Sequence, residues 1–158
     1  MTEDKQGIVL GQDEGRGYNL YGALALFKAT GEETNGAYTQ MEVHYPPNYQ
    51  SYRHVHIREH ESFYVLEGEL EVGLGDDVVR LGPGSFAESP PGQPHWLRNA
   101  GPGKVRYICT LVPAGFEGFI MELGRPVPGT YEVVGPEPPD DIERVIATAR
   151  RYGADVPD

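Results

Sequence analysis

Four side chains in two short stretches have the types and the spacing that a metal site needs. His54 and His56 are two residues apart, so on an extended strand both side chains point to the same face. Glu61 follows five residues after His56, and His95 lies in a second stretch, residues 84–99, which is punctuated by proline and glycine. Imidazole and carboxylate groups suit one divalent transition metal: Fe, Ni, Mn, Co, Cu or Zn.

An ordinary pair of strands is the alternative interpretation of the same residues. A lone His-x-His pair arises by chance, His56 on an exposed strand needs no ligand, and Glu61 can be a solvated charge. The glutamate at a fixed distance and the second stretch ending near a histidine favour the metal site. For His60, which lies between the ligand candidates, we expect an exposed or neighbouring position in preference to a fifth ligand.

The first stretch resembles the first signature motif of the cupin superfamily. That motif is glycine, five residues, His-x-His, three or four residues, glutamate, six residues, glycine. In this chain His54, His56, Glu61 and Gly68 fill it, and only the opening glycine is replaced, by Asn48. Asparagine tolerates positive φ better than most residues, so we expect the turn at Asn48 to be kept.

The second stretch resembles the second cupin motif, in which every position is filled. The motif is glycine, five residues, Pro-x-Gly, two residues, histidine, three residues, asparagine, and residues 84–99 match it with Pro90, Gly92, His95 and Asn99. The resemblance implies that His54, His56, Glu61 and His95 are the metal ligands. In quercetin dioxygenase-like cupins the corresponding glutamate also acts as a base, which implies a catalytic role for Glu61.

The order of turn signals predicts an all-β fold. Breaks about every 8 to 12 residues are typical of antiparallel sandwiches and barrels. Residues 37–45 alternate cleanly, and we expect Gln40, Glu42 and His44 on the solvent face. The predicted strands cover residues 8–10, 18–30, 37–45, 54–56, 61–66, 69–74, 78–81, 85–89, 95–98 and 104–112, with a bulge at Gly22. The resemblance implies an antiparallel jelly-roll barrel over residues 37–112 within one cupin domain, residues 1–158, similar to single-domain cupins.

The extension over residues 113–158 has helical periodicity in two places. Phe116, Phe119 and Ile120 have helical spacing, so residues 113–124 are expected either to close the barrel mouth as a lid or to cover a sheet face. Residues 140–152 are predicted to form a C-terminal helix with Asp140 as its N-cap and Gly153 as its stop.

Charge and composition exclude several classes of partner. The chain has 158 residues, with 24 acidic against 13 basic residues and a net charge of −11, which disfavours nucleic acid. Its N-terminal residues lack the apolar core of a signal peptide, and its apolar runs are too short to span a bilayer. We therefore expect a cytoplasmic protein that binds no membrane. The single cysteine, Cys109, is expected to be a buried small side chain in preference to a catalytic thiol.

The predicted function is that of a metal-dependent dioxygenase, like quercetin dioxygenase, acting on an aromatic or enolisable small molecule with dioxygen. The substrate pocket is predicted from Phe63, Phe86, Leu97 and Phe116, whereas Trp96 has the opposite strand parity to His95 and should pack outside. The alternatives are a metal-dependent isomerase, lyase or decarboxylase, and a non-catalytic cupin that binds a small molecule. Pairing through strand edges predicts a homodimer.

Overall fold

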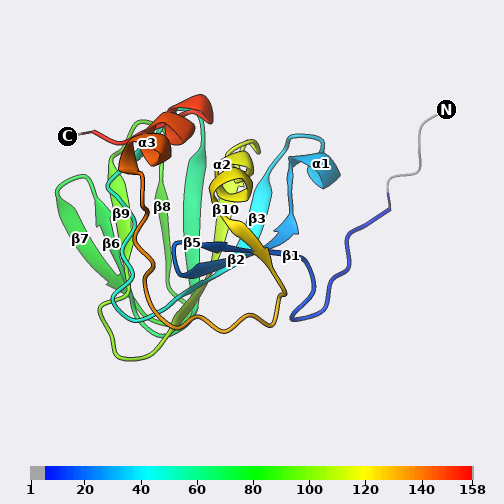
Figure 1. The fold of residues 1–158 in the computed structure, drawn as a ribbon, viewed down its shortest axis with the longest axis horizontal. Helices are drawn as coiled ribbons and strands as arrows, with labels where there is room; N and C mark the ends of the chain where they lie inside the picture. Colours follow the sequence, from blue (N-terminus) through cyan, green and yellow to red (C-terminus); the bar gives the residue numbers. More distant parts are fainter. Residues whose placement is uncertain (1–5, 158) are drawn as a thin grey trace.

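Antiparallel strands are the main regular elements of the computed structural model, which describes residues 6–157 (Figure 1). The strands are β1 (Arg16–Leu20), β2 (Ala23–Ala29), β3 (Thr39–Tyr45), β4 (Val55–His56), β5 (His60–Glu67), β6 (Leu70–Leu74), β7 (Asp77–Leu81), β8 (Phe86–Ser89), β9 (His95–Arg98), β10 (Val105–Val112), β11 (Arg125–Val127) and β12 (Ala154–Asp155). The helices are α1 (Gly31–Thr34), α2 (Glu117–Leu123) and α3 (Ile142–Arg151), and all three lie along the same edge of the molecule in Figure 1.

Two larger sheets and one short strand pair form the barrel. The seven-stranded sheet has the order β11-β1-β2-β3-β10-β5-β8, the three-stranded sheet has the order β7-β6-β9, and β12 pairs with β4. Every strand pair is antiparallel. This architecture, with the C-terminal helix α3, confirms the predicted all-β jelly-roll fold.

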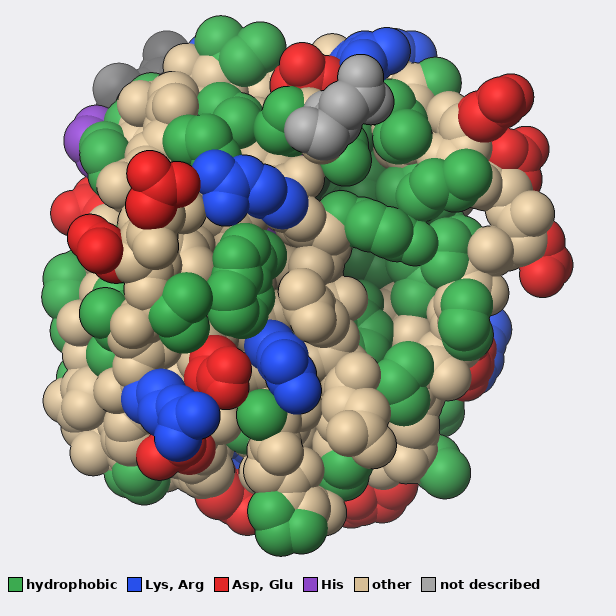
Figure 2. Space-filling model, turned by 90° about the vertical axis from the view of Figure 1, so that its left-hand side faces the viewer, with side chains coloured by type: hydrophobic (Ala, Val, Ile, Leu, Met, Phe, Trp, Pro, Cys, Tyr) green, Lys and Arg blue, Asp and Glu red, His purple; other side chains and the backbone are tan. Residues whose placement is uncertain are grey.

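The core lies between the sheets and follows the period-2 pattern of the strands. In β3 the residues Thr39, Met41, Val43 and Tyr45 are buried, and the alternate residues Gln40, Glu42 and His44 face outward and are half-buried, as predicted. Phe63 of β5 and Leu97 of β9 enter the same core from opposite sheets. On the face shown in Figure 2, hydrophobic side chains surround a hollow that leads into the molecule.

Trp96 and Asn48 take the positions predicted for them. Trp96 lies opposite Gly73 on the outer face of the three-stranded sheet, and a Cβ at Gly73 would come within 2.1 Å of the Trp96 ring nitrogen. Asn48 has φ 67°, so the turn that a glycine marks in the motif is kept.

Two predictions near the N-terminus are wrong. Residues 8–10 form no strand, and Val9 is 92% exposed, because these residues lie outside every sheet of the structure. Gly22 is not in a bulge: Tyr21 and Gly22 have φ of 52° and 100° and join β1 to β2 as a two-residue hairpin turn. A Cβ at Gly22 would lie 2.2 Å from the carbonyl oxygen of Gly135, which explains the glycine.

The C-terminal extension contributes strands that the sequence pattern does not reveal. β11 pairs with β1 at one edge of the large sheet, and β12 pairs with β4, so that Ala154 lies opposite His56. Strands of two or three residues are too short to show a period. None of the helices within residues 6–157 is long and apolar enough to cross a membrane.

The last helix begins one residue later than predicted. Its N-cap is Asp141 and not Asp140, because Asp141 has extended backbone dihedral angles and its Oδ1 accepts a hydrogen bond from the Arg144 amide at 3.0 Å. The helix buries Val145, Thr148 and Ala149 and leaves Ile142 exposed.

Replacing the N-cap should therefore destabilise the protein, whereas replacing its neighbour should not. We expect Asp141→Ala to lower the free energy of unfolding by about 1 kcal/mol, because one amide of the first helical turn loses its acceptor. Asp140→Ala is the matched control and should leave the value unchanged. Urea unfolding of both variants measures the difference. An equal loss of unfolding free energy in the two variants would contradict the assignment of Asp141 as the N-cap.

Glu117 anchors the start of α2 to the barrel. Its carboxylate accepts hydrogen bonds from the Gly31 amide at 2.8 Å, the Thr39 hydroxyl at 2.6 Å and the Gly115 amide at 2.7 Å. Burial raises the pKa of Glu117, but these hydrogen bonds together lower the pKa by more than burial raises it. The pKa of Glu117 therefore lies below the usual value. The ionised carboxylate therefore stabilises the folded state.

This anchor predicts a pH-dependent stability difference. A carboxyl with a lowered folded-state pKa contributes stability above its unfolded pKa of about 4.3 and loses it as the pH falls through the folded value. Glu117→Gln should therefore be less stable than wild type at pH 7, and the gap should narrow in acid. Thermal unfolding of both proteins at several pH values between neutral and acidic measures this stability gap. Glu132→Gln, at an exposed glutamate, is the control. A gap that does not change with pH would contradict the prediction.

Candidate metal centre

Three strands bring the four predicted ligands to one end of the barrel interior. His54 and His95 form an antiparallel bridge, in which their amides and carbonyls exchange hydrogen bonds of 3.0 and 2.9 Å. His56 follows in β4 on the same face as His54, and Glu61 enters from β5. Strand alternation and this bridge thus direct all four side chains towards one place inside the barrel.

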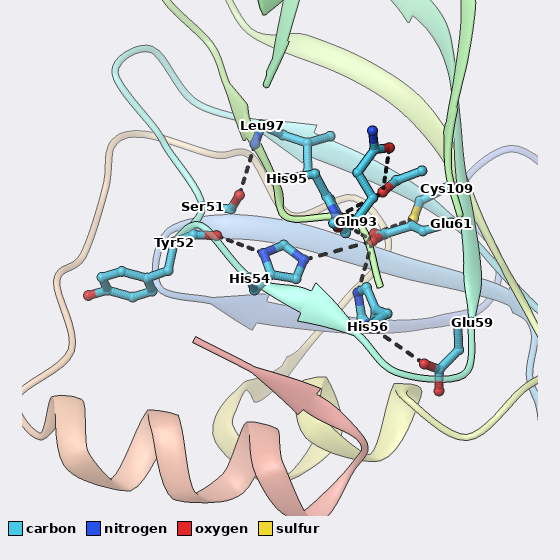
Figure 3. A network of polar contacts seen from close by, with 11 residues as sticks. Ser51, Tyr52, His54, His56, Glu59, Glu61, Gln93, His95, Leu97 and Cys109 are labelled. Carbon is cyan, nitrogen blue, oxygen red and sulfur yellow. Dashed lines mark hydrogen bonds and ion pairs between the residues drawn. The ribbon is translucent and has the colours of Figure 1, made fainter. Parts of the chain in front are cut away.

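The ligand atoms converge on the Glu61 carboxylate (Figure 3). Glu61 Oε2 lies 2.7 Å from His95 Nε2, 2.9 Å from His56 Nε2 and 3.8 Å from His54 Nε2. One ligand atom from each of the four residues lies within 4.8 Å of the others. His56, Glu61 and His95 are buried and His54 is half-buried.

The other ring nitrogen of each histidine faces an oxygen. His54 Nδ1 lies 2.6 Å from the Tyr52 carbonyl oxygen, and His95 Nδ1 lies 3.0 Å from that of Gln93. His56 Nδ1 faces Glu59 Oε2 at 3.5 Å. With a metal bound, an acceptor at Nδ1 would keep the proton there and leave the Nε2 lone pair for the metal, which is the tautomer that a metal ligand needs.

The electrostatics of the cluster favour an ionised Glu61. Burial raises the pKa of Glu61, but the charge of His56 and the three histidine ring nitrogens that face its carboxylate hold the pKa well below the usual value. Burial lowers the pKa of His54, and Glu61 offsets only part of that effect. The pKa of His56 is lowered by burial, but the facing carboxylates of Glu61 and Glu59 raise it to about 9.

The residues fit a divalent transition metal. Both ring nitrogens of His56 are buried and have no hydrogen-bond partner of suitable geometry within residues 6–157. Buried polar atoms without partners are rare in proteins, and a cation bound at Nε2 would satisfy one of them. Three neutral imidazoles and one carboxylate are a donor set for Fe, Ni, Mn, Co, Cu or Zn.

A cavity of about 340 Å³ adjoins the ligands, and His54 and Glu61 are part of its wall. Most other lining side chains are aliphatic or aromatic, and they include Met41, Leu97 and Ile120. The Cys109 thiol, also in the wall, is buried and lies 3.3 Å from Glu61 Oε1. Burial raises the pKa of Cys109 well above its usual value, so the sulfur stays protonated.

The structure brings two of the four predicted pocket residues to the cavity. Leu97 and Phe116 line it, whereas Phe63 is completely buried in the core behind the ligands. The prediction for Phe86 is wrong, because its side chain is 59% exposed. In the register of β5 and β8, Phe86 lies opposite the exposed Tyr64, and Ala87 lies opposite the inward-facing Phe63.

The segment before α2 and the helix itself lie against the site. The Phe116 ring meets the His56 ring edge to face at 4.4 Å, and Phe119 stacks on Phe116 at 5.0 Å. Phe116, Phe119 and Ile120 all line the cavity. These three side chains of the segment over residues 113–124 are therefore part of the cavity wall, a position that a lid over the barrel mouth would also have.

Other residues at the site were missed or were placed elsewhere. Tyr45, Tyr49 and Tyr107 line the cavity and were not predicted. The strand parity of Tyr45 and Tyr107 would have been enough to predict these two. Glu59 was missed because a charged residue in a predicted turn is usually exposed. His60 is exposed and pairs with Glu88 at 3.1 Å, away from the ligands.

Comparison with known proteins agrees with this geometry. Residues 41–111 match the family model of the cupin domain. Quercetin 2,3-dioxygenase from Bacillus subtilis (strain 168) is 29% identical over 101 residues, which are 64% of this chain and 30% of that protein. The chain thus spans less than a third of the length of this curated relative.

Two solved structures share the fold. A predicted oxalate decarboxylase from Thermotoga maritima superposes with a TM-score of 0.60 at 20% identity, over 66% of this chain and 98% of that one. A sugar phosphate isomerase of the cupin superfamily from Silicibacter pomeroyi has a TM-score of 0.52 at 21% identity, over 60% and 61% of the two chains. Both motifs are filled and their side chains gather inside an antiparallel jelly roll, so residues 41–111 have the sequence pattern and the fold of a cupin domain.

Proposed function

We propose that this chain binds one divalent transition metal through His54, His56, Glu61 and His95 and acts as a dioxygenase on an aromatic or enolisable small molecule. The observation that carries the proposal is the ligand cluster in the wall of a largely apolar cavity. The similarity to quercetin 2,3-dioxygenase supports it.

The cavity lining favours an uncharged, flat substrate. None of the side chains that line it within residues 6–157 is lysine or arginine, whereas aromatic side chains such as Tyr107 and Phe116 line it on several sides. A phosphate or a second carboxylate taken out of water needs a cationic partner, because burying an unpaired charge is costly. An aromatic ring pays little desolvation free energy on entering such a cavity. It gains free energy from buried apolar surface and from contacts with the aromatic side chains.

Glu61 is the group proposed to move a proton. A bound divalent metal would supply Lewis-acid activation of an enol or hydroxyl oxygen. The Glu61 carboxylate lies in the cavity wall, is ionised because of its lowered pKa, and so is able to accept the proton of that hydroxyl. The apolar walls exclude water, and Phe116 limits how a substrate ring approaches His56.

Metal analysis tests the binding site directly. Wild-type protein purified without chelator or nickel affinity should hold about one equivalent of transition metal per chain. His54→Ala should lose most of it, because one of four ligands is removed. His60→Ala is the matched control, since that exposed histidine pairs with Glu88 and not with the cluster. Wild type that remains metal-free after reconstitution, with its fold intact by circular dichroism, would refute the site.

Oxygen consumption tests the reaction. Metal-loaded wild type should take up dioxygen while consuming flavonols or enolisable diketones, measured with an oxygen electrode and by absorbance. Glu61→Gln should slow turnover by about 10²–10⁴-fold, because the amide cannot accept the proton. Glu88→Gln, a surface carboxylate, should not slow it. Substrate conversion without oxygen uptake would instead show an isomerase, lyase or decarboxylase.

A further inference from the structure

The turn between β4 and β5 contains a carboxylate that no part of the proposed reaction uses. Glu59 is 0% exposed, although its neighbours Ile57 and Arg58 in the same turn are exposed. Burying an ionisable group without a partner is strongly unfavourable, so a glutamate in this position needs a physical reason.

The surroundings of Glu59 point to one neighbour. Its Oε2 lies 3.5 Å from His56 Nδ1, and its Oε1 lies 3.8 Å from Arg58 Nη2, which belongs to an exposed side chain. Neither carboxylate oxygen of Glu59, nor His56 Nδ1, has a hydrogen-bond partner in the described part of the chain. Two buried, unpartnered groups thus face each other on the side of His56 that points away from Glu61 (Figure 3).

The other two histidine ligands show what is missing at His56. The rings of His54 and His95 each have a main-chain carbonyl oxygen at Nδ1, from Tyr52 and Gln93. At His56 the side chain of Glu59 takes the place of such a carbonyl. A carboxylate is the stronger acceptor of the two, and it makes the ring a better electron-pair donor at Nε2.

We propose that Glu59 is the positioning residue for His56: it accepts the Nδ1–H hydrogen bond and so holds the ring with Nε2 directed at the metal. The two atoms are 3.5 Å apart, and a small rotation of either side chain would bring them within hydrogen-bond distance. Phe116 packs on the His56 ring, so the ring is held by one polar and one apolar contact. The inference rests on the proposed metal site, and Glu59 acts through His56 without touching substrate.

Metal affinity without turnover is the first test. Zn²⁺ affinity is measured by competition with a chromophoric chelator for wild type, Glu59→Leu and Glu59→Gln. Leucine fills a similar volume without an acceptor and should weaken binding by about 10–100-fold. Glutamine keeps an acceptor oxygen and should weaken it less. Glu88→Leu is the matched control, because it removes the surface His60–Glu88 pair and should leave the affinity unchanged.

Two further measurements separate positioning from a general loss of structure. Above the His56 pKa of about 9, the unfolding temperature of metal-free Glu59→Leu should equal or exceed that of wild type, because His56 is then neutral and an apolar side chain replaces a buried charge. In the Zn²⁺-loaded proteins, nuclear magnetic resonance should show a downfield His56 Nδ1 proton in wild type. In Glu59→Leu this resonance should move upfield.

The outcomes distinguish this inference from the proposed function. Wild type that binds Zn²⁺ with an affinity that Glu59→Leu does not change would overturn the role of Glu59 and leave the metal site intact. Weaker binding with a lower unfolding temperature and an unchanged Nδ1 resonance would also overturn it, in favour of a structural role. Wild type that binds no Zn²⁺ would overturn the metal site, and both proposals with it.

Discussion

The convergence of three imidazoles on one buried carboxylate is the constraint on which the rest of this structure depends. Glu61 is largely removed from solvent, so the Nε2 groups of His54, His56 and His95 supply favourable interactions in place of water. Such a cluster keeps its geometry only on a rigid support. The two sheets provide that support: each ligand is on a strand, or on a bridge, whose neighbours are hydrogen-bonded.

The weakest part of that support is β4, and the C-terminal extension stabilises it. β4 has two residues, too few to be stable alone, and it pairs with β12. The Ile57 amide donates to the Gly153 carbonyl at 2.9 Å just beyond this pair. Helix α3, which precedes β12, is packed on the barrel through Val145 and Ala149. The extension therefore helps to hold His56 in place, although it lies outside the segment that matches the family model.

The same extension also gives the cavity its character. The extension lines the cavity mainly with apolar side chains, which include Pro136, Pro138, Val145, Ala149 and Val156, and with one carboxylate, that of Glu137. The barrel strands contribute Tyr45 and Tyr107, whose rings meet edge to face at 5.3 Å. Related folds with similar ligands accommodate different chemistry when these walls differ. In this chain the candidate metal ligands lie within the segment that matches the family model, and much of the apolar wall belongs to the extension.

The sequence by itself determined the candidate ligand set, most barrel strands and the turn at Asn48, because these depend on local spacing, period-2 alternation and backbone preference. Tertiary structure decided what alternation leaves open. Strand register turned Phe86 outward opposite Tyr64, and a pairing between segments far apart in the chain created β12. Glu59 is a charged residue in a turn, which predicts an exposed side chain. Only the tertiary structure shows that it is buried beside His56. Local chemistry can be read along the chain, whereas burial and non-local pairing exist only once the chain has folded.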